Sequence, residues 1–199
     1  MLNIHTMPLG AYQTNCYLLW QDGQDSCLVI DPGYEPEKVL KKAGQLGKRI
    51  EAILLTHGHF DHVGGVLQLA ADTDCHVYLC EKDLSMPQQL TAGPLYYTHT
   101  YGEGNTLTLA GITLQVLHTP GHTPGSVCLI AEDALFSGDT LFEGSCGRTD
   151  LPGGDTATIL ASLARLRQLP GDYRVYPGHG SATTLSEERR FNPYLKGIL

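Results

Sequence analysis

The chain has 199 residues, of which 42% are hydrophobic, and its formal net charge is −8. This length suits one domain with a sizeable core over residues 1–199, and the composition is that of a globular protein rather than a disordered chain. The negative charge and the lack of a basic run argue against a nucleic-acid-binding surface. No apolar run has membrane-spanning length, and Met1–His5 lacks the basic start and apolar core of a signal peptide, so we expect no membrane partner.

The six cysteines are scattered along the chain, and none belongs to a CxxC pair. A chain of this length folds without covalent cross-links, so most of these residues are expected to be buried, reduced thiols. This cysteine usage favours a cytoplasmic location. Cys146 stands apart, because it lies in a predicted loop close to Asp139.

Short apolar runs alternate with helical segments along the chain. The first half predicts strands near 13–20, 26–30, 50–55 and 76–79, with helices at 36–46 and 63–71. The second half predicts strands near 106–117, 126–130, 134–137 and 173–176, a helix at 155–168 and a short helix near 186–191. This order is β-rich with interspersed helices, which fits packed α/β layers better than an all-β sandwich.

Four candidate metal ligands occur in the segment THGHFDH, which directly follows the strand predicted at 50–55: His57, His59, Asp61 and His62. Imidazole and carboxylate are the groups that bind a catalytic divalent metal. Because side chains alternate along an extended chain, His57 and His59 point to the same side, and the other two follow as the chain turns. Two ligand pairs in one segment predict a site for two metals, each with further ligands from elsewhere.

Three later loops supply such ligands, and each loop follows a predicted strand. His122 lies in TPGHTPGS, Asp139 ends the run DALFSGD, and His179 lies in PGHG. Loops that follow strands can converge on one edge of a sheet system, so these side chains can meet the first group. Each loop alone is a weak signal, whereas the ordered set is strong.

The ordered motifs HxHxDH, PGHTPGS, SGD and PGHG resemble those of the metallo-β-lactamase superfamily, and within it the small glyoxalase II-like hydrolases. The resemblance runs from the Asp31–Gly33 turn to the tail at 191–195. It implies an α/β fold, an αββα sandwich of two mixed β-sheets flanked by helices, with the metals at one edge. It also implies one metal held by His57, His59 and His122, a second held by Asp61, His62 and His179, and Asp139 as the bridge between them.

This ligand set predicts a hydrolase with two divalent ions, with zinc as the expected metal and iron or manganese as the alternatives. Two ions about 3.5–4 Å apart can share a hydroxide that attacks a carbonyl group, while a metal polarises the carbonyl oxygen. We assign His59, Asp61 and Asp139 to catalysis. A thioester suits such a site, because a thiol of pKa about 8.5 leaves as thiolate without a general acid. The expected partner is therefore a small-molecule acyl thioester such as S-lactoylglutathione.

Two segments are candidates for the substrate wall: 85–104, which holds Tyr97, and 144–155, which holds Arg148. The planar guanidinium of Arg148 could bind a substrate carboxylate, or it could pair with Asp150 or Asp155. Tyr97 could contact the substrate, or it could pack the loop over the edge of the sandwich. Both pairs of alternatives stay open at this point.

Two other functions also stay open. The sequence CGRTD at 146–150 resembles a stretch in the persulfide dioxygenases, which use the same scaffold with a single iron and leave Asp61, His62 and His179 largely without metal. A non-catalytic metal-binding module is the other alternative, although the intact ligand set argues against it. Glyoxalase II enzymes with high glutathione specificity carry a helical C-terminal domain, and this sequence ends soon after His179. The resemblance therefore implies thioester hydrolysis more firmly than glutathione recognition.

Overall fold

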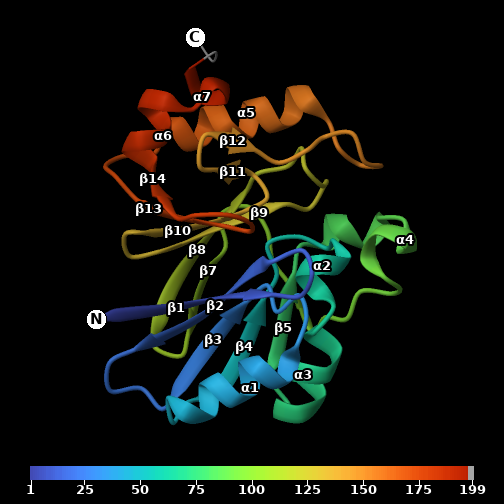
Figure 1. The fold of residues 1–199 in the computed structure, drawn as a ribbon, viewed down its shortest axis with the longest axis vertical. Helices are drawn as coiled ribbons and strands as arrows, with labels where there is room; N and C mark the ends of the chain where they lie inside the picture. The colour runs from blue at the N-terminus through green and yellow to red at the C-terminus, as the bar shows by residue number, and fades with distance from the viewer. Residues whose placement is uncertain (197–199) are drawn as a thin grey trace.

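The structure is a computed structural model that describes residues 1–196, so the last three positions of the domain predicted over 1–199 lie outside the described residues. Two six-stranded sheets face each other, with the orders β1-β2-β3-β4-β5-β6 and β14-β13-β10-β9-β8-β7, and helices cover their outer faces (Figure 1). The predicted α/β sandwich of two mixed sheets is confirmed.

The first half of the chain forms the first sheet. Its strands are β1 (Leu2–Leu9), β2 (Thr14–Gln21), β3 (Ser26–Ile30), β4 (Arg49–Leu54), β5 (His76–Leu79) and β6 (His99–Thr100). Its helices are α1 (Pro36–Gln45), α2 (Phe60–Val63), α3 (Val66–Thr73), the 3-10 helix η1 (Glu81–Ser85) and α4 (Gln88–Thr91). Strands β3 to β6 run parallel, so the loops after β4 and β5 leave the sheet at the same edge.

The second half forms the second sheet and a small hairpin. The strands are β7 (Thr106–Leu109), β8 (Ile112–His118), β9 (Val127–Ala131), β10 (Ala134–Gly138), β13 (Arg174–Pro177) and β14 (Thr183–Thr184), and the hairpin is β11 (Leu141–Phe142) with β12 (Ser145–Cys146). The helices are α5 (Thr156–Arg167), α6 (Leu185–Phe191) and α7 (Pro193–Lys196). Within residues 1–196, no helix combines the length and the apolar character needed to cross a bilayer.

Three apolar layers hold the sandwich together. The middle layer lies between the sheets and joins Leu28 and Leu54 of the first sheet to Phe136 of the second. The outer layers pack α1 and α3 against one sheet, and α5, α6 and α7 against the other (Figure 1). Strand β3 is apolar at successive positions because both of its faces are buried, with Leu28 facing inward and Val29 facing the helices.

Two predicted elements are divided in the structure. The strand predicted at 106–117 is the β7–β8 hairpin, since Ala110 and Gly111 both adopt positive φ angles, 49° and 73°, and reverse the chain. The helix predicted at 63–71 is α2 and α3, interrupted at Gly64 and Gly65. A Cβ atom at Gly64 would lie 2.3 Å from the carbonyl oxygen of Gly33, so the two glycines admit the chain that follows β3.

Candidate metal centre

The THGHFDH segment lies at the carboxyl end of β4, between that strand and α2. His57 and His59 lie in the connection, and Asp61 and His62 lie in the first turn of α2. Asp31, at the end of β3, anchors the start of the segment by accepting hydrogen bonds from the backbone N–H of Thr56 at 2.8 Å and from its hydroxyl at 2.6 Å.

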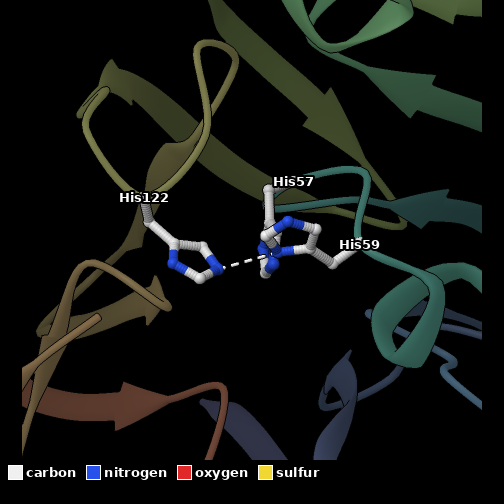
Figure 2. A group of neighbouring side chains, drawn as sticks. All are labelled: His57, His59 and His122. Atoms are coloured by element: carbon white, nitrogen blue, oxygen red, sulfur yellow. Dashed lines mark hydrogen bonds between the residues drawn. The ribbon is translucent and has the colours of Figure 1, made fainter. Parts of the chain in front are cut away.

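The first group of candidate ligands is His57, His59 and His122, whose ligand atoms lie within 4.8 Å of one another. Figure 2 shows the three rings converging, with His122 reaching in from a different loop than His57 and His59. That loop joins β8 to β9, so the group combines side chains from both sheets. Nδ1 of His59 lies 2.8 Å from Nε2 of His122, and all three side chains are buried.

The second group is Asp61, His62 and His179, whose ligand atoms also lie within 4.8 Å of one another. His179 follows β13 in the second sheet, and its Nε2 lies 3.2 Å from Oδ2 of Asp61. This group, too, is assembled from both halves of the chain.

Asp139 lies between the two groups. Its Oδ1 is 3.4 Å from Nε2 of His62, and its Oδ2 is 3.5 Å from Nε2 of His122 and 3.6 Å from Nε2 of His179. Gly178 makes this position accessible, since a Cβ atom there would lie 2.1 Å from Oδ1 of Asp139. The structure thus brings together all seven predicted ligands, and the bridging role of Asp139 stays a prediction.

The residues fit divalent metals. His57 Nε2, His59 Nε2 and Asp139 Oδ1 are buried side-chain atoms without a hydrogen-bond partner among the described residues, and all three belong to the predicted ligand set. A buried polar atom without a partner costs about 1–3 kcal/mol, a penalty that ligation removes. The donors are imidazoles and carboxylates, the set that zinc, iron and manganese accept.

A further group of nearby side chains, Asp31, His57 and His62, is explained without a metal. Both carboxylate oxygens of Asp31 already accept hydrogen bonds from Thr56, and Oδ2 lies 2.9 Å from Nδ1 of His62. Asp31 therefore orients the His62 ring, so that its Nε2 faces Asp61 and Asp139. Sequence reasoning noted Asp31 only as part of a turn.

The electrostatics of the site differ between the two groups. Burial lowers the pKa of His57 well below its usual range, and burial with the nearby His122 lowers the pKa of His59 to about 4. These rings are neutral at neutral pH, the form that binds a metal. Burial alone would also lower the pKa of His62, but the carboxylates of Asp139 and Asp31 outweigh it and raise that pKa well above its usual value.

Five of the seven candidate ligands line a cleft of about 470 Å³: His59, Asp61, His122, Asp139 and His179. Its wall is largely apolar. The apolar lining residues are Tyr12, Phe60, Leu90, Phe142 and Leu151. The polar residues in the wall are Ser145, Cys146 and Arg148, all from the β11–β12 hairpin and the segment that follows it.

Residues 9–179 match the sequence model of the metallo-beta-lactamase superfamily. The chain belongs to this superfamily. It is 38% identical to the hydroxyacylglutathione hydrolase GloC of Haemophilus influenzae, in an alignment that covers 98% of each chain. Among solved structures, BLEG-1 B3 metallo-beta-lactamase matches 99% of this chain and 100% of its own at 39% identity with a TM-score of 0.89. The di-iron-bound form of TTHA1623 matches 96% of this chain and 100% of its own at 42% identity with a TM-score of 0.83.

On this metallo-beta-lactamase scaffold, the two predicted substrate residues differ in position. Arg148 lines the cleft, and its guanidinium donates two hydrogen bonds to the carboxylate of Asp150, at 2.7 and 2.8 Å. Its backbone carbonyl oxygen also lies 2.8 Å from Nδ1 of His122. Tyr97 is 40% exposed and is not among the residues that line the cleft. From its segment, 85–104, the cleft takes Leu90 instead. Substrate contact by either residue stays a prediction.

The N-terminal strands support the second ligand group through contacts that were not predicted from the sequence. Thr14 donates a hydrogen bond to Oδ2 of Asp61 at 3.1 Å, and Asn15 donates to the backbone carbonyl oxygens of Pro177 and Gly180 at 3.0 and 2.9 Å. The hydroxyl of Tyr17 donates to the same Pro177 oxygen. The partners of Asn15 lie more than 160 residues away in the sequence, so no local sequence pattern reveals these contacts.

Proposed function

We propose that the protein is a binuclear, metal-dependent hydrolase that cleaves acyl thioesters such as S-lactoylglutathione. The observation that supports it best is the arrangement of six candidate ligands as two groups of three around the carboxylate of Asp139, the seventh, beside a cleft that five of the seven line. The relative from Haemophilus influenzae, named as a hydroxyacylglutathione hydrolase, supports the choice of a thioester.

Two bound divalent ions would supply an activated water and a Lewis acid for the carbonyl oxygen. His57 and His59, both neutral at neutral pH, and His122 would hold one ion, whereas Asp61, His62 and His179 would hold the other. Asp139, His59 and Asp61 line the cleft, where they would face the reacting group of a substrate. Hydrolysis breaks the acyl C–S bond, and water supplies the oxygen of the carboxylate product and the proton of the thiol.

The cleft lining favours a thioester over an amide. Outside the ligand set, the described residues that line the cleft include no carboxyl group and no imidazole. An amide nitrogen needs a proton as it leaves, whereas a thiolate leaves without one. The same difference weighs against β-lactam hydrolysis, the second candidate, which comes from the solved structure named as a B3 metallo-beta-lactamase.

We further infer zinc as the native metal, with iron and manganese as the alternatives, because histidine and carboxylate sites accept all three. The di-iron-bound form of TTHA1623 is the reason to keep iron among these alternatives. We propose a cytoplasmic enzyme with a small-molecule partner and neither nucleic acid nor membrane. The support is that all six cysteines are free, as in proteins of a reducing compartment, and that the net charge is −8.

One experiment separates these functions. Purified protein of measured metal content is assayed with S-lactoylglutathione, a β-lactam and glutathione persulfide. We expect two metal ions per chain, thioester hydrolysis and little β-lactam turnover. Oxygen consumption with the persulfide, one iron per chain and no thioester cleavage would instead establish a persulfide dioxygenase.

A further inference from the structure

Asp83 is a buried carboxylate that lies beside the candidate metal centre without belonging to it. It lies in η1, just after β5, and its side chain is fully buried. Among the described residues, it is in none of the three groups of side chains that could hold an ion. Burial raises the pKa of its carboxyl group. A buried acid at this position needs a reason, because burying it is costly unless it is fully hydrogen-bonded.

Three donors satisfy Asp83, and they come from the two loops whose histidines face each other in Figure 2. The backbone N–H of Gly58, between His57 and His59, donates to Oδ2 at 2.8 Å. In the other loop, the hydroxyl of Thr123 donates to Oδ2 at 3.0 Å and the backbone N–H of Gly125 donates to Oδ1 at 2.5 Å. One carboxylate thus ties the loop after β4 in the first sheet to the loop after β8 in the second.

Gly125 allows this close approach. A Cβ atom at Gly125 would lie 2.6 Å from Oδ1 and Cγ of Asp83, closer than real Cβ contacts. A Cβ atom at Gly58 would lie 3.0 Å from Leu95 and 3.4 Å from Cβ of Asp83. Gly125, in the ligand motif PGHTPGS, therefore serves the contact with Asp83, whereas Gly58 contributes its backbone N–H.

We propose that Asp83 is the positioning residue of the His57, His59 and His122 metal site, holding its two loops at the separation that ligation requires. Asp83 acts through two backbone N–H groups and the Thr123 hydroxyl, and it is not itself one of the candidate metal ligands. The second site depends on other supports, Asp31 for His62 and Thr14 for Asp61. Loss of Asp83 should therefore weaken metal binding at one site and spare the other. This proposal deepens the proposed function, on whose metal centre it rests.

The test measures zinc affinity of metal-free protein against a chromophoric chelator, in backgrounds that leave one site intact. In Asp61→Ala, which disables the second site, adding Asp83→Asn should weaken zinc binding about 10- to 100-fold, the usual loss when an outer support of a ligand is removed. In His122→Ala, which disables the first site, the same substitution should leave zinc affinity unchanged. Equal losses in both backgrounds, or no loss in the first, would overturn the proposal.

Glu51→Gln is the matched control. Glu51 also ties the two halves together, since it accepts hydrogen bonds from Ser26 and from the backbone N–H of Ala110, but it lies near the start of β4, away from the site. Glu51→Gln should leave zinc affinity unchanged in both backgrounds. A loss of zinc affinity equal to that of Asp83→Asn would show that the effect is not specific to Asp83 and would overturn the proposal. If Asp83→Asn does not fold, Thr123→Val removes one donor and should give a smaller loss, again at the first site only. Because the titration contains no substrate, its result does not depend on which substrate the enzyme cleaves.

Discussion

The guanidinium of Arg148 has two competing partners, the carboxylate of Asp150 and any anionic group in the cleft. The pair with Asp150 is largely exposed, so it holds Arg148 only weakly. Arg148→Ala should raise KM for anionic thioesters more than for neutral ones, with metal content intact, because a remote contact positions the substrate. Steady-state kinetics with a matched pair of thioesters measures this difference.

Asp150→Asn is the counterpart, since it releases Arg148 without removing it. We expect KM for anionic thioesters to fall in this variant. If Arg148→Ala instead weakens both substrates equally and lowers the melting temperature, the ion pair has a structural role and Arg148 does not select the substrate.

The buried thiols give a pH dependence that is independent of the metal. Burial raises the pKa of Cys27 and of Cys128 from an ordinary 9.0 to about 11. Between these values the unfolded chain has released protons that the folded chain still holds, so these thiols stabilise the folded state fully below pH 9, and this contribution is lost as pH rises to 11. Denaturant unfolding followed by circular dichroism should show this loss, and it should be smaller in Cys27→Ala/Cys128→Ala. A free energy of unfolding that stays constant up to pH 11 would contradict it.

At the scale of elements, helix α6 supports one wall of the cleft. Asn192, directly after the helix, donates hydrogen bonds to the carbonyl oxygens of Ser145 and Phe142 at 3.0 and 3.3 Å. Glu188, also buried, accepts from the backbone N–H of Gly144 at 2.9 Å. The β11–β12 hairpin, which brings Phe142 and Cys146 to the cleft, is therefore fixed by the C-terminal helices.

Asn192→Ala should loosen this hairpin. Unpaired carbonyl oxygens would lower the free energy of unfolding by about 1–3 kcal/mol, and KM should rise while zinc content is kept. Denaturant unfolding, kinetics and elemental analysis check the three effects. Asn3→Ala is the control, because Asn3 makes comparable contacts in β1 at an exposed site. An unchanged KM in a destabilised Asn192→Ala protein would show that the hairpin keeps its shape unaided.

Elements with two buried faces could be predicted from the sequence, and peripheral ones could not. The strands at 26–30 and 76–79 have the predicted bounds, because an apolar run marks burial on both faces. Strand β1 was missed, since Leu2 and Leu9 are its only fully buried residues. The candidate ligands could be predicted because histidine and aspartate in these motifs are typical metal ligands. Asp83 and Asn15 could not, because they bind groups of segments that are distant in the sequence. No local pattern records such pairings.

At the scale of the whole molecule, metal binding at the proposed ligands would join the two sheets, because each ligand group takes side chains from both. A metal ion that binds only the folded chain stabilises it, by about 2.7 kcal/mol when the free metal concentration is a hundred times Kd. Removing the metal should therefore lower the melting temperature by roughly 5–10 °C for a chain of this size. Calorimetry before and after chelation, and again after zinc is restored, checks this shift. A melting temperature that does not move as the metal content falls to zero would contradict it.

The contacts of Asn15 with the loop that carries His179 set an order of events during synthesis. The carbonyl oxygen of Gly180 lies 165 residues along the chain from its Asn15 partner. At about 5–20 residues per second, the ribosome needs roughly ten to thirty seconds to make the intervening chain. For the later part of that time, the 117 residues from His62 to His179, the nascent protein presents the HxHxDH histidines without their last partner. If Asp61, His62 and His179 hold a metal as proposed, filling of that position would therefore be a late step, which follows synthesis of the segment that carries His179.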